Sequence, residues 1–120
     1  MEQTALRAKL FDVLRAGREV RSDISDRSYE EFLADRLLRQ STYWQLMIIG
    51  EALNQAAKIA PDLRTRLPDL QDIVGLRNRI VHAYGDINDR VIWFAITDRL
   101  PELIAWVETF LNEGTATESC

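Results

Sequence analysis

Residues 43–60 read YWQLMIIGEALNQAAKIA, and their apolar side chains lie nearly all the way round a helical wheel. A helix that is apolar on every side is typical of a buried element, so we expect this segment to be the central helix of the fold. Pro61 should end it, because proline has no backbone N–H, and a short turn should follow. No segment alternates apolar and polar residues for long enough to predict a strand.

Upstream of this segment, apolar residues recur at helical spacing. The stripe that starts at Leu6 predicts a first helix, which Gly17 should stop. Ser28 and Glu31 form an S-x-x-E capping box, which predicts the start of a second helix.

Two further helices are predicted downstream. Pro68 can occupy the first turn of a helix over residues 70–81, which the run at 84–86, Tyr-Gly-Asp, should end. Asn88 has the chemistry of the next N-cap. Pro101 lies inside the last apolar stripe and predicts a kink or a restart there.

These segments predict an all-α fold, an antiparallel helical bundle of about four to five helices. Short connections favour antiparallel neighbours, so we expect the first and last helices to flank the central one. The helical domain should span residues 1–113, followed by a flexible C-terminal tail at 114–120.

The composition of the 120 residues, 47% hydrophobic and 28% charged, is typical of a soluble globular protein. A net charge of -4 argues against a broad basic surface for nucleic acid, so any such activity must be local. The chain has no secretory signal pattern and no apolar run near the ~20 residues that span a membrane, which predicts a cytoplasmic protein without membrane contact. Its one cysteine, Cys120, excludes an intrachain disulfide.

Arg77 falls in the middle of the apolar stripe of the helix predicted over residues 70–81. A buried guanidinium without a partner is costly. Arg77 must therefore extend to solvent, pair with an acid such as Glu51, or face a cleft where an anion binds.

His82 is the only histidine, and an imidazole can transfer protons near neutral pH, although a lone histidine is more often structural. Gly75 and Asn78 share its side of the helix. Gly75 leaves that side bare, which suggests close approach by another backbone or a ligand, and Asn78 could hold the imidazole or a phosphate oxygen. Arg77 lies about 140° away from His82 around a regular helix. The two could converge through a long Arg side chain, a helix end near His82, or a second copy of the helix.

Metal ligands are scarce near these residues. A zinc site usually needs three or four protein ligands, whereas this region offers one His and no Cys. A two-metal site would need clustered carboxylates, but Asp69 and Asp72 lie well upstream and Asp86 lies beyond the helix. We therefore expect no metal and no cofactor.

The run at residues 77–84, RNRIVHAY, resembles the R-x4-H-x-Y motif of HepT-like proteins in the HEPN superfamily. Residues 48–52, IIGEA, resemble the I-G-E-A signature on the central helix of these proteins. The helix order fits from Leu6 to about Glu113, so the resemblance covers nearly the whole chain.

The resemblance implies a homodimer whose two motif helices face each other and form a composite, metal-independent site for cutting RNA. In that reading His82 takes the proton from a ribose 2'-hydroxyl, and Arg77 stabilises the charge developing on the phosphate. Asn78 helps to position one of the two, and Arg79 adds a phosphate contact.

The resemblance also implies a role and a partner. The chain would be the toxin of a type VII toxin–antitoxin system, and a minimal nucleotidyltransferase antitoxin would neutralise it by attaching AMP to Tyr84. Two alternatives remain: a non-catalytic subunit that presents nucleotide or substrate to the nucleotidyltransferase, and a structural dimerisation module. Intact Arg77 and His82 count against the first, and the second leaves Arg77 and Gly75 unexplained.

Overall fold

A computed structural model describes residues 2–67, 69–82 and 86–119 of the chain. Within these ranges every regular element is helical, which confirms the all-α prediction. The roles predicted for Pro68, Tyr84 and Gly85 lie outside the described residues. In the part of the chain that is described, no helix is long and apolar enough to cross a membrane.

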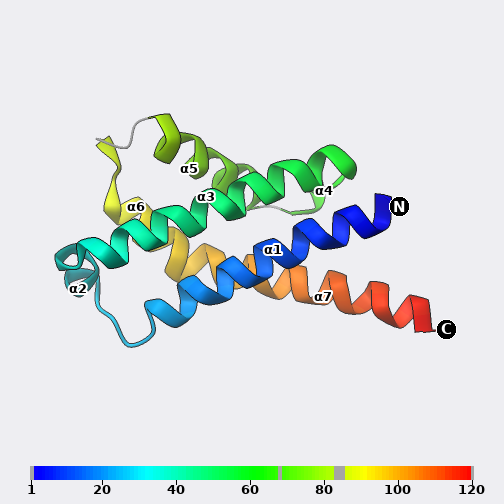
Figure 1. The fold of residues 1–120 in the computed structure, drawn as a ribbon, viewed down its shortest axis with the longest axis horizontal. Coiled ribbons are helices and arrows are strands. Elements are labelled where there is room, and N and C mark those ends of the chain that lie inside the picture. The colour runs from blue at the N-terminus through cyan, green and yellow to red at the C-terminus, as the bar shows by residue number, and fades with distance from the viewer. Residues whose placement is uncertain (1, 68, 83–85, 120) are drawn as a thin grey trace.

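Four long helices make up most of the fold, and consecutive ones run in opposite directions along the long axis (Figure 1). The long helices are α1 (Glu2–Asp23), α3 (Arg36–Ile59), α5 (Leu70–His82) and α7 (Leu100–Ser119). Between them lie α2 (Tyr29–Ala34), α4 (Leu63–Arg66), α6 (Asp89–Phe94) and the π-helical turn η2 (Ala95–Arg99). The described residues therefore form an antiparallel bundle of four long helices with three short ones added.

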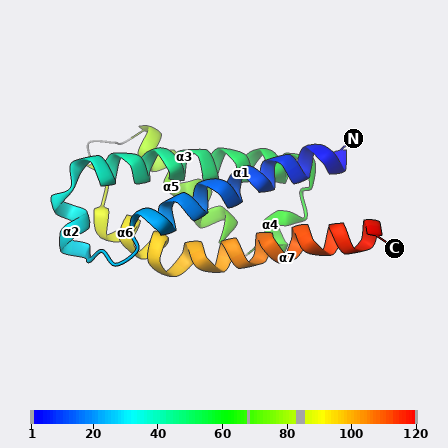
Figure 2. The same ribbon diagram turned by 60° about the horizontal axis from the view of Figure 1, so that its bottom comes forward.

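The central helix α3 packs against α1 on one side and α5 on the other. The last helix, α7, packs against α1 instead, as both views of the fold show (Figures 1 and 2). The expectation that the first and last helices flank the central one is therefore wrong for the last helix. This arrangement leaves one whole side of α3 outside the bundle.

The core lies between the inward faces of the long helices. Its fully buried side chains include Leu10, Val13, Leu46, Ile49, Leu53, Ile96 and Val107. The expectation that residues 43–60 are buried all round is wrong, because Trp44 on the outer side of α3 is 60% exposed. The helix also begins earlier than predicted, at Arg36, where the carboxylate of Asp35 accepts a hydrogen bond from the Leu38 N–H at 3.0 Å.

Gly17 does not end the first helix, contrary to the sequence prediction. It lies inside α1, and a Cβ atom at this position would lie 3.1 Å from the side chain of Ile104 on α7. The missing side chain lets α7 approach α1 closely. The helix continues to Asp23, and Val20 in its last turns is buried.

Three other predicted helix boundaries are confirmed. The capping box of Ser28 and Glu31 is present at the start of α2, and Asn88 caps α6 by accepting hydrogen bonds from two backbone N–H groups. The central helix ends at Ile59, just before Pro61, as predicted. The turn expected after it contains the one-turn helix α4 instead.

The predicted break at Pro101 takes the form of a π-helical turn. The N–H of Leu100 donates to the carbonyl of Ala95, five residues back, and α7 restarts from there. Proline lacks the N–H that a regular α-helix would use at the next position, so the wider turn falls directly before it. The backbone of α7 is helical to Ser119. The flexibility expected of residues 114–120 stays a prediction.

Candidate functional site

The helix α5 has an inner and an outer face. The side chains buried on its inner face are Leu70, Ile73, Leu76 and Ile80. At 100° per residue the opposite face carries Gln71, Gly75, Asn78 and His82, of which the three residues with side chains are exposed. The sequence prediction that Gly75, Asn78 and His82 share one side therefore describes the solvent face of the helix.

Arg77 lies where α5 crosses α3 at Gly50. A Cβ atom at Gly50 would collide with the Cβ of Arg77 and would lie 2.9 Å from its Cγ. Only glycine allows the two helices to come this close. This contact gives a physical role to the glycine of the IIGEA segment, which sequence reasoning noted only as part of a signature.

The guanidinium of Arg77 forms an ion pair with Glu51, with 3.3 Å between Nη2 and Oε2. Its Nη1 donates to the Asn78 side-chain oxygen at 2.9 Å, and Gln55 donates to Glu51 at 2.8 Å. Of the three alternatives for Arg77, pairing with Glu51 is the one found. The Arg77 side chain is still 30% exposed, and a guanidinium has five N–H donors, so it can also bind an incoming anion.

His82 is the last residue of α5, and its side chain is exposed. It lies one turn beyond Asn78 and Arg79, on the outer face. Among the described residues no hydrogen bond or ion pair joins His82 to Arg77. A single chain therefore places the two residues in the C-terminal half of one helix without bringing them together.

The outer face of α5 is bare beside His82, as predicted. A Cβ atom built at Gly75 would have no neighbouring atom within 4 Å among the described residues. The glycine is therefore not required by packing inside the described chain. No described residue of the chain makes a close approach at this position.

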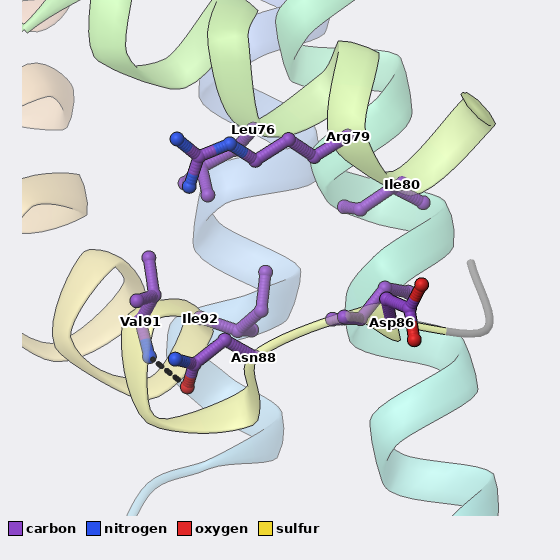
Figure 3. A pocket seen from close by; sticks show the side chains of 8 residues that line it. Leu76, Arg79, Ile80, Asp86, Asn88, Val91 and Ile92 are labelled. Carbon is purple, nitrogen blue, oxygen red and sulfur yellow. Dashed lines mark hydrogen bonds between the residues drawn. The ribbon is translucent and has the colours of Figure 1, made fainter. Parts of the chain in front are cut away.

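A groove lies beside this face, between α5 and the segment formed by α6 and η2. It consists of two adjoining hollows of about 320 and 290 Å³, which share Leu76, Arg79 and Val91. Figure 3 shows Arg79 extending along the α5 side of the first hollow, opposite Val91 and Ile92 on α6. Gly75 lines the second hollow, so the groove begins on the face that carries His82.

Sequence reasoning missed Phe94 and Arg99, which line the second hollow. Phe94 is 50% exposed, although large apolar side chains are usually buried. One signal was available, because Phe94 lies off the apolar stripe that Ile92 on α6 and Ile96 on η2 define. Its position on the helix therefore indicated a side chain that faces away from the core.

The remaining predicted features can be stated briefly. Tyr84 lies outside the described residues. Within the described ranges, no three His, Cys, Asp or Glu side chains are grouped so that they could hold a metal ion.

Fold and site together define a small all-α protein with a paired, accessible arginine and an exposed histidine in the C-terminal half of a single helix. Residues 13–110 match the family model "Ribonuclease HepT-like", and the chain belongs to this family. This finding confirms the resemblance seen in the sequence.

Several curated proteins are similar to the chain along much of their length. One, from Methanocaldococcus jannaschii, is named "Putative RNase MJ1380" and is 30% identical over 110 residues, which is 90% of this chain and 98% of that protein. Another, from Caldanaerobacter subterraneus, is named "Putative RNase TTE0752" and is 33% identical over 86 residues, covering 72% of this chain and 76% of its own. A third, "Probable ribonuclease HepT" from Thermococcus cleftensis, is 29% identical over 77 residues, 62% and 67% of the two chains. No solved structure matches the chain significantly.

Proposed function

We propose that this HepT-like protein is a metal-independent endoribonuclease whose site is built from Arg77 and His82 of two copies of the chain. One observation carries the proposal. The ion pair with Glu51 holds the guanidinium of Arg77 at the surface, and His82 is exposed at the end of the same helix, five residues later. These two groups can supply phosphate stabilisation and proton transfer.

The chemistry needs no further reactant. His82 accepts the proton of a ribose 2'-hydroxyl, and the 2'-oxygen attacks the adjacent phosphorus atom. The bond from phosphorus to the 5'-oxygen breaks, and the leaving oxygen takes a proton from solvent. Arg77 donates to the non-bridging phosphate oxygens as their charge grows, and Asn78 keeps the guanidinium in place. The products are a 2',3'-cyclic phosphate and a 5'-hydroxyl.

The exposed side of α3 supports pairing with a second copy. Leu37, Trp44 and Ile48 follow one another at spacings of seven and four residues, so they share a face, and Glu51 continues it. Leu37 is 71% and Trp44 60% exposed. This apolar stripe ends at Glu51, the ion-pair partner of Arg77. A two-fold interface along the stripe would bring two motif helices together. The second copy would then supply the convergence of Arg77 and His82 that one chain lacks.

We further propose that the protein is the toxin of a type VII toxin–antitoxin pair and that a nucleotidyltransferase antitoxin adds AMP to Tyr84. The motif places this phenol two residues after His82. An AMP group there would bring negative charge to the place where the RNA phosphate must bind. Modification would therefore block the site electrostatically and sterically.

A second candidate function is a non-catalytic subunit that presents nucleotide or substrate to the nucleotidyltransferase. The ion pair of Arg77 with Glu51 favours it, because a paired arginine can serve structure alone. The two candidates differ in whether the purified protein cuts RNA.

Cleavage of single-stranded RNA by the purified protein tests the proposal. Cutting should persist in EDTA, should leave 2',3'-cyclic phosphate and 5'-hydroxyl ends, and should fail on RNA with a 2'-methoxy group at the cut. Arg77→Ala and His82→Ala should each lose activity by at least about a hundredfold, within the ranges for loss of charge stabilisation and of proton-transfer catalysis. Arg18→Ala is the matched control, because Arg18 also forms an exposed ion pair, but with Glu108 on α7 and not with a residue of α3 or α5. Cleavage that needs magnesium, or that leaves 5'-phosphate ends, would rule out this chemistry.

A further inference from the structure

The groove between α5 and the α6–η2 segment has the composition of a nucleic-acid contact. Its second hollow combines an exposed aromatic ring, that of Phe94, with two arginines, Arg79 and Arg99. Bases stack on aromatic faces, and guanidinium groups bind phosphate oxygens. A patch with both chemistries is better suited to RNA than to an apolar peptide.

The ring of Phe94 is held in place without being covered. Arg99 lies over it, with 5.6 Å from the guanidinium carbon to the ring centre. Arg99 is in turn fixed by Asp69, whose carboxylate lies 2.8 Å from Nη1 and is nearly buried. Half of the Phe94 side chain remains exposed, so a base can still stack on it. An anchored aromatic loses little conformational freedom when it binds.

Among the described residues, Arg79 is a cation without a protein partner. It is exposed, and within the described ranges no ion pair or hydrogen bond involves its guanidinium. It lies three residues before His82, so the two side chains are neighbours on the helix surface. An RNA strand cut at His82 would pass Arg79 next.

The acidic groups around the groove leave it able to bind an anion. Asp69 is neutralised by Arg99, and Asp72 lies at the edge of the second hollow. Asp86 lines the first hollow, away from Phe94. The carboxylate of Asp72 can accept hydrogen bonds from amino groups on a base edge. Among the described residues around Phe94, one arginine, Arg79, and one acid, Asp72, are therefore left without an ion pair.

We propose that this groove is a subsite for single-stranded RNA, in which a base beside the cleaved phosphate stacks on Phe94 and its phosphate binds Arg79. The inference rests on the proposed ribonuclease function and adds a path for the substrate. Gly75 lines the groove on the face that carries His82, and its missing side chain leaves room for the ribose-phosphate chain.

Binding of an RNA oligonucleotide with 2'-methoxy groups throughout, which cannot be cut, tests this subsite by fluorescence anisotropy. Phe94→Ala should weaken binding about tenfold through loss of stacking. Arg79→Gln should weaken binding and lower the slope of log affinity against log salt by about 0.7, the value for one phosphate contact on a single strand. An oligonucleotide carrying 5-iodouridine should crosslink under light to the peptide that contains Phe94.

Phe11→Ala is the matched control, because Phe11 is 49% exposed, has Arg7 over its ring and lies on α1. It should bind as the wild type does. If the wild type binds and cuts RNA while Phe94→Ala and Arg79→Gln match it, the subsite is wrong and the ribonuclease function stands. If the wild type neither binds nor cuts RNA, both proposals fail. If the two variants bind RNA as the wild type does but no longer bind the nucleotidyltransferase, the groove is a protein interface and the RNA subsite is again wrong.

Discussion

Gly50 sets the position of Arg77. Because a side chain at Gly50 would collide with Arg77, the Gly50→Ala protein has to move α5 away from α3. We expect it to lose about 1–3 kcal/mol of unfolding free energy, the usual cost of overpacking a tight contact, together with catalytic activity. Denaturant unfolding and an RNA cleavage assay measure the two effects.

Gly75→Ala is the matched control for this prediction. The added methyl group meets nothing among the described residues. In a helix interior, alanine is more stable than glycine by up to about 1 kcal/mol. Its free energy of unfolding should stay level or rise. Equal destabilisation by the two substitutions would contradict the role assigned to Gly50.

Tyr84 gives a second prediction at the scale of single residues. Co-expression with a cognate nucleotidyltransferase should add the mass of one or more AMP groups to the wild-type chain and none to Tyr84→Phe. Intact-mass spectrometry decides this, with Tyr29→Phe, on α2, as a control phenol. AMP that is still found on Tyr84→Phe would remove the proposed mechanism of neutralisation.

The caps of the helices could be predicted because they depend on neighbours in the sequence. Ser28 with Glu31 and Asn88 act within a few residues of themselves, and the structure confirms both caps. The prediction that Gly17 ends the first helix is wrong because this glycine serves a tertiary contact. It makes room for Ile104, about ninety residues later, and no local pattern shows that contact.

The candidate site likewise has features that follow from local sequence and features that depend on how the helices pack. The helical wheel placed Gly75, Asn78 and His82 on one face correctly. The collision of Gly50 with Arg77 depends on how α3 and α5 cross, and the aromatic of the groove depends on where α6 lies. Neither arrangement follows from spacing along one helix.

The capping box of α2 predicts a dependence of stability on pH. Hydrogen bonds from the backbone and side chain of Ser28 hold the pKa of Glu31 below its ordinary value. A carboxyl group with a lowered folded pKa stabilises the fold above its unfolded pKa, and this contribution disappears as pH falls through the folded value. Wild type should therefore lose more stability than Glu31→Gln as pH is lowered below the ordinary glutamate range.

The measurement is denaturant unfolding at a series of acid pH values. Ser28→Ala should be less stable by about 1 kcal/mol at neutral pH, the usual cost of losing an N-cap. Glu30→Gln serves as the control, since Glu30 lies beside Glu31 without a hydrogen bond to Ser28. If Glu31→Gln and wild type respond alike to acid, the capping box makes no contribution that depends on pH.

At the scale of the whole molecule, the outer side of α3 predicts the assembly. Trp44→Arg puts a charge in the middle of the apolar stripe and should give monomers in sedimentation equilibrium, with cleavage lost and helicity kept. Phe11→Arg, an equally drastic change at an exposed aromatic of α1, should leave the assembly intact. A dimer that tolerates Trp44→Arg would place the interface elsewhere.

Mixing two inactive proteins tests whether the site is shared. If Arg77 of one copy acts with His82 of the other, a mixed dimer of Arg77→Ala and His82→Ala keeps one intact site. Random exchange should then restore about a quarter of the wild-type activity, since half of the dimers are mixed and each has one of two sites. No recovery after demonstrated exchange would show that each site belongs to a single chain.

The π-helical turn η2 keeps the core-facing residues of α6 and α7 on the same side of one continuous helix. Ile92, Ile96 and Leu100 all face the core at spacings of four residues, which a regular helix would let drift by about 40° at each step. The one extra residue in the wide turn absorbs this drift. Inserting one more residue after Thr97, which the wide turn cannot accommodate as well, would rotate everything beyond it by about 100° relative to α6. Val107 would then leave the core while Phe94 kept its position, so the length of this segment sets how the groove is aligned with the contact between α7 and α1.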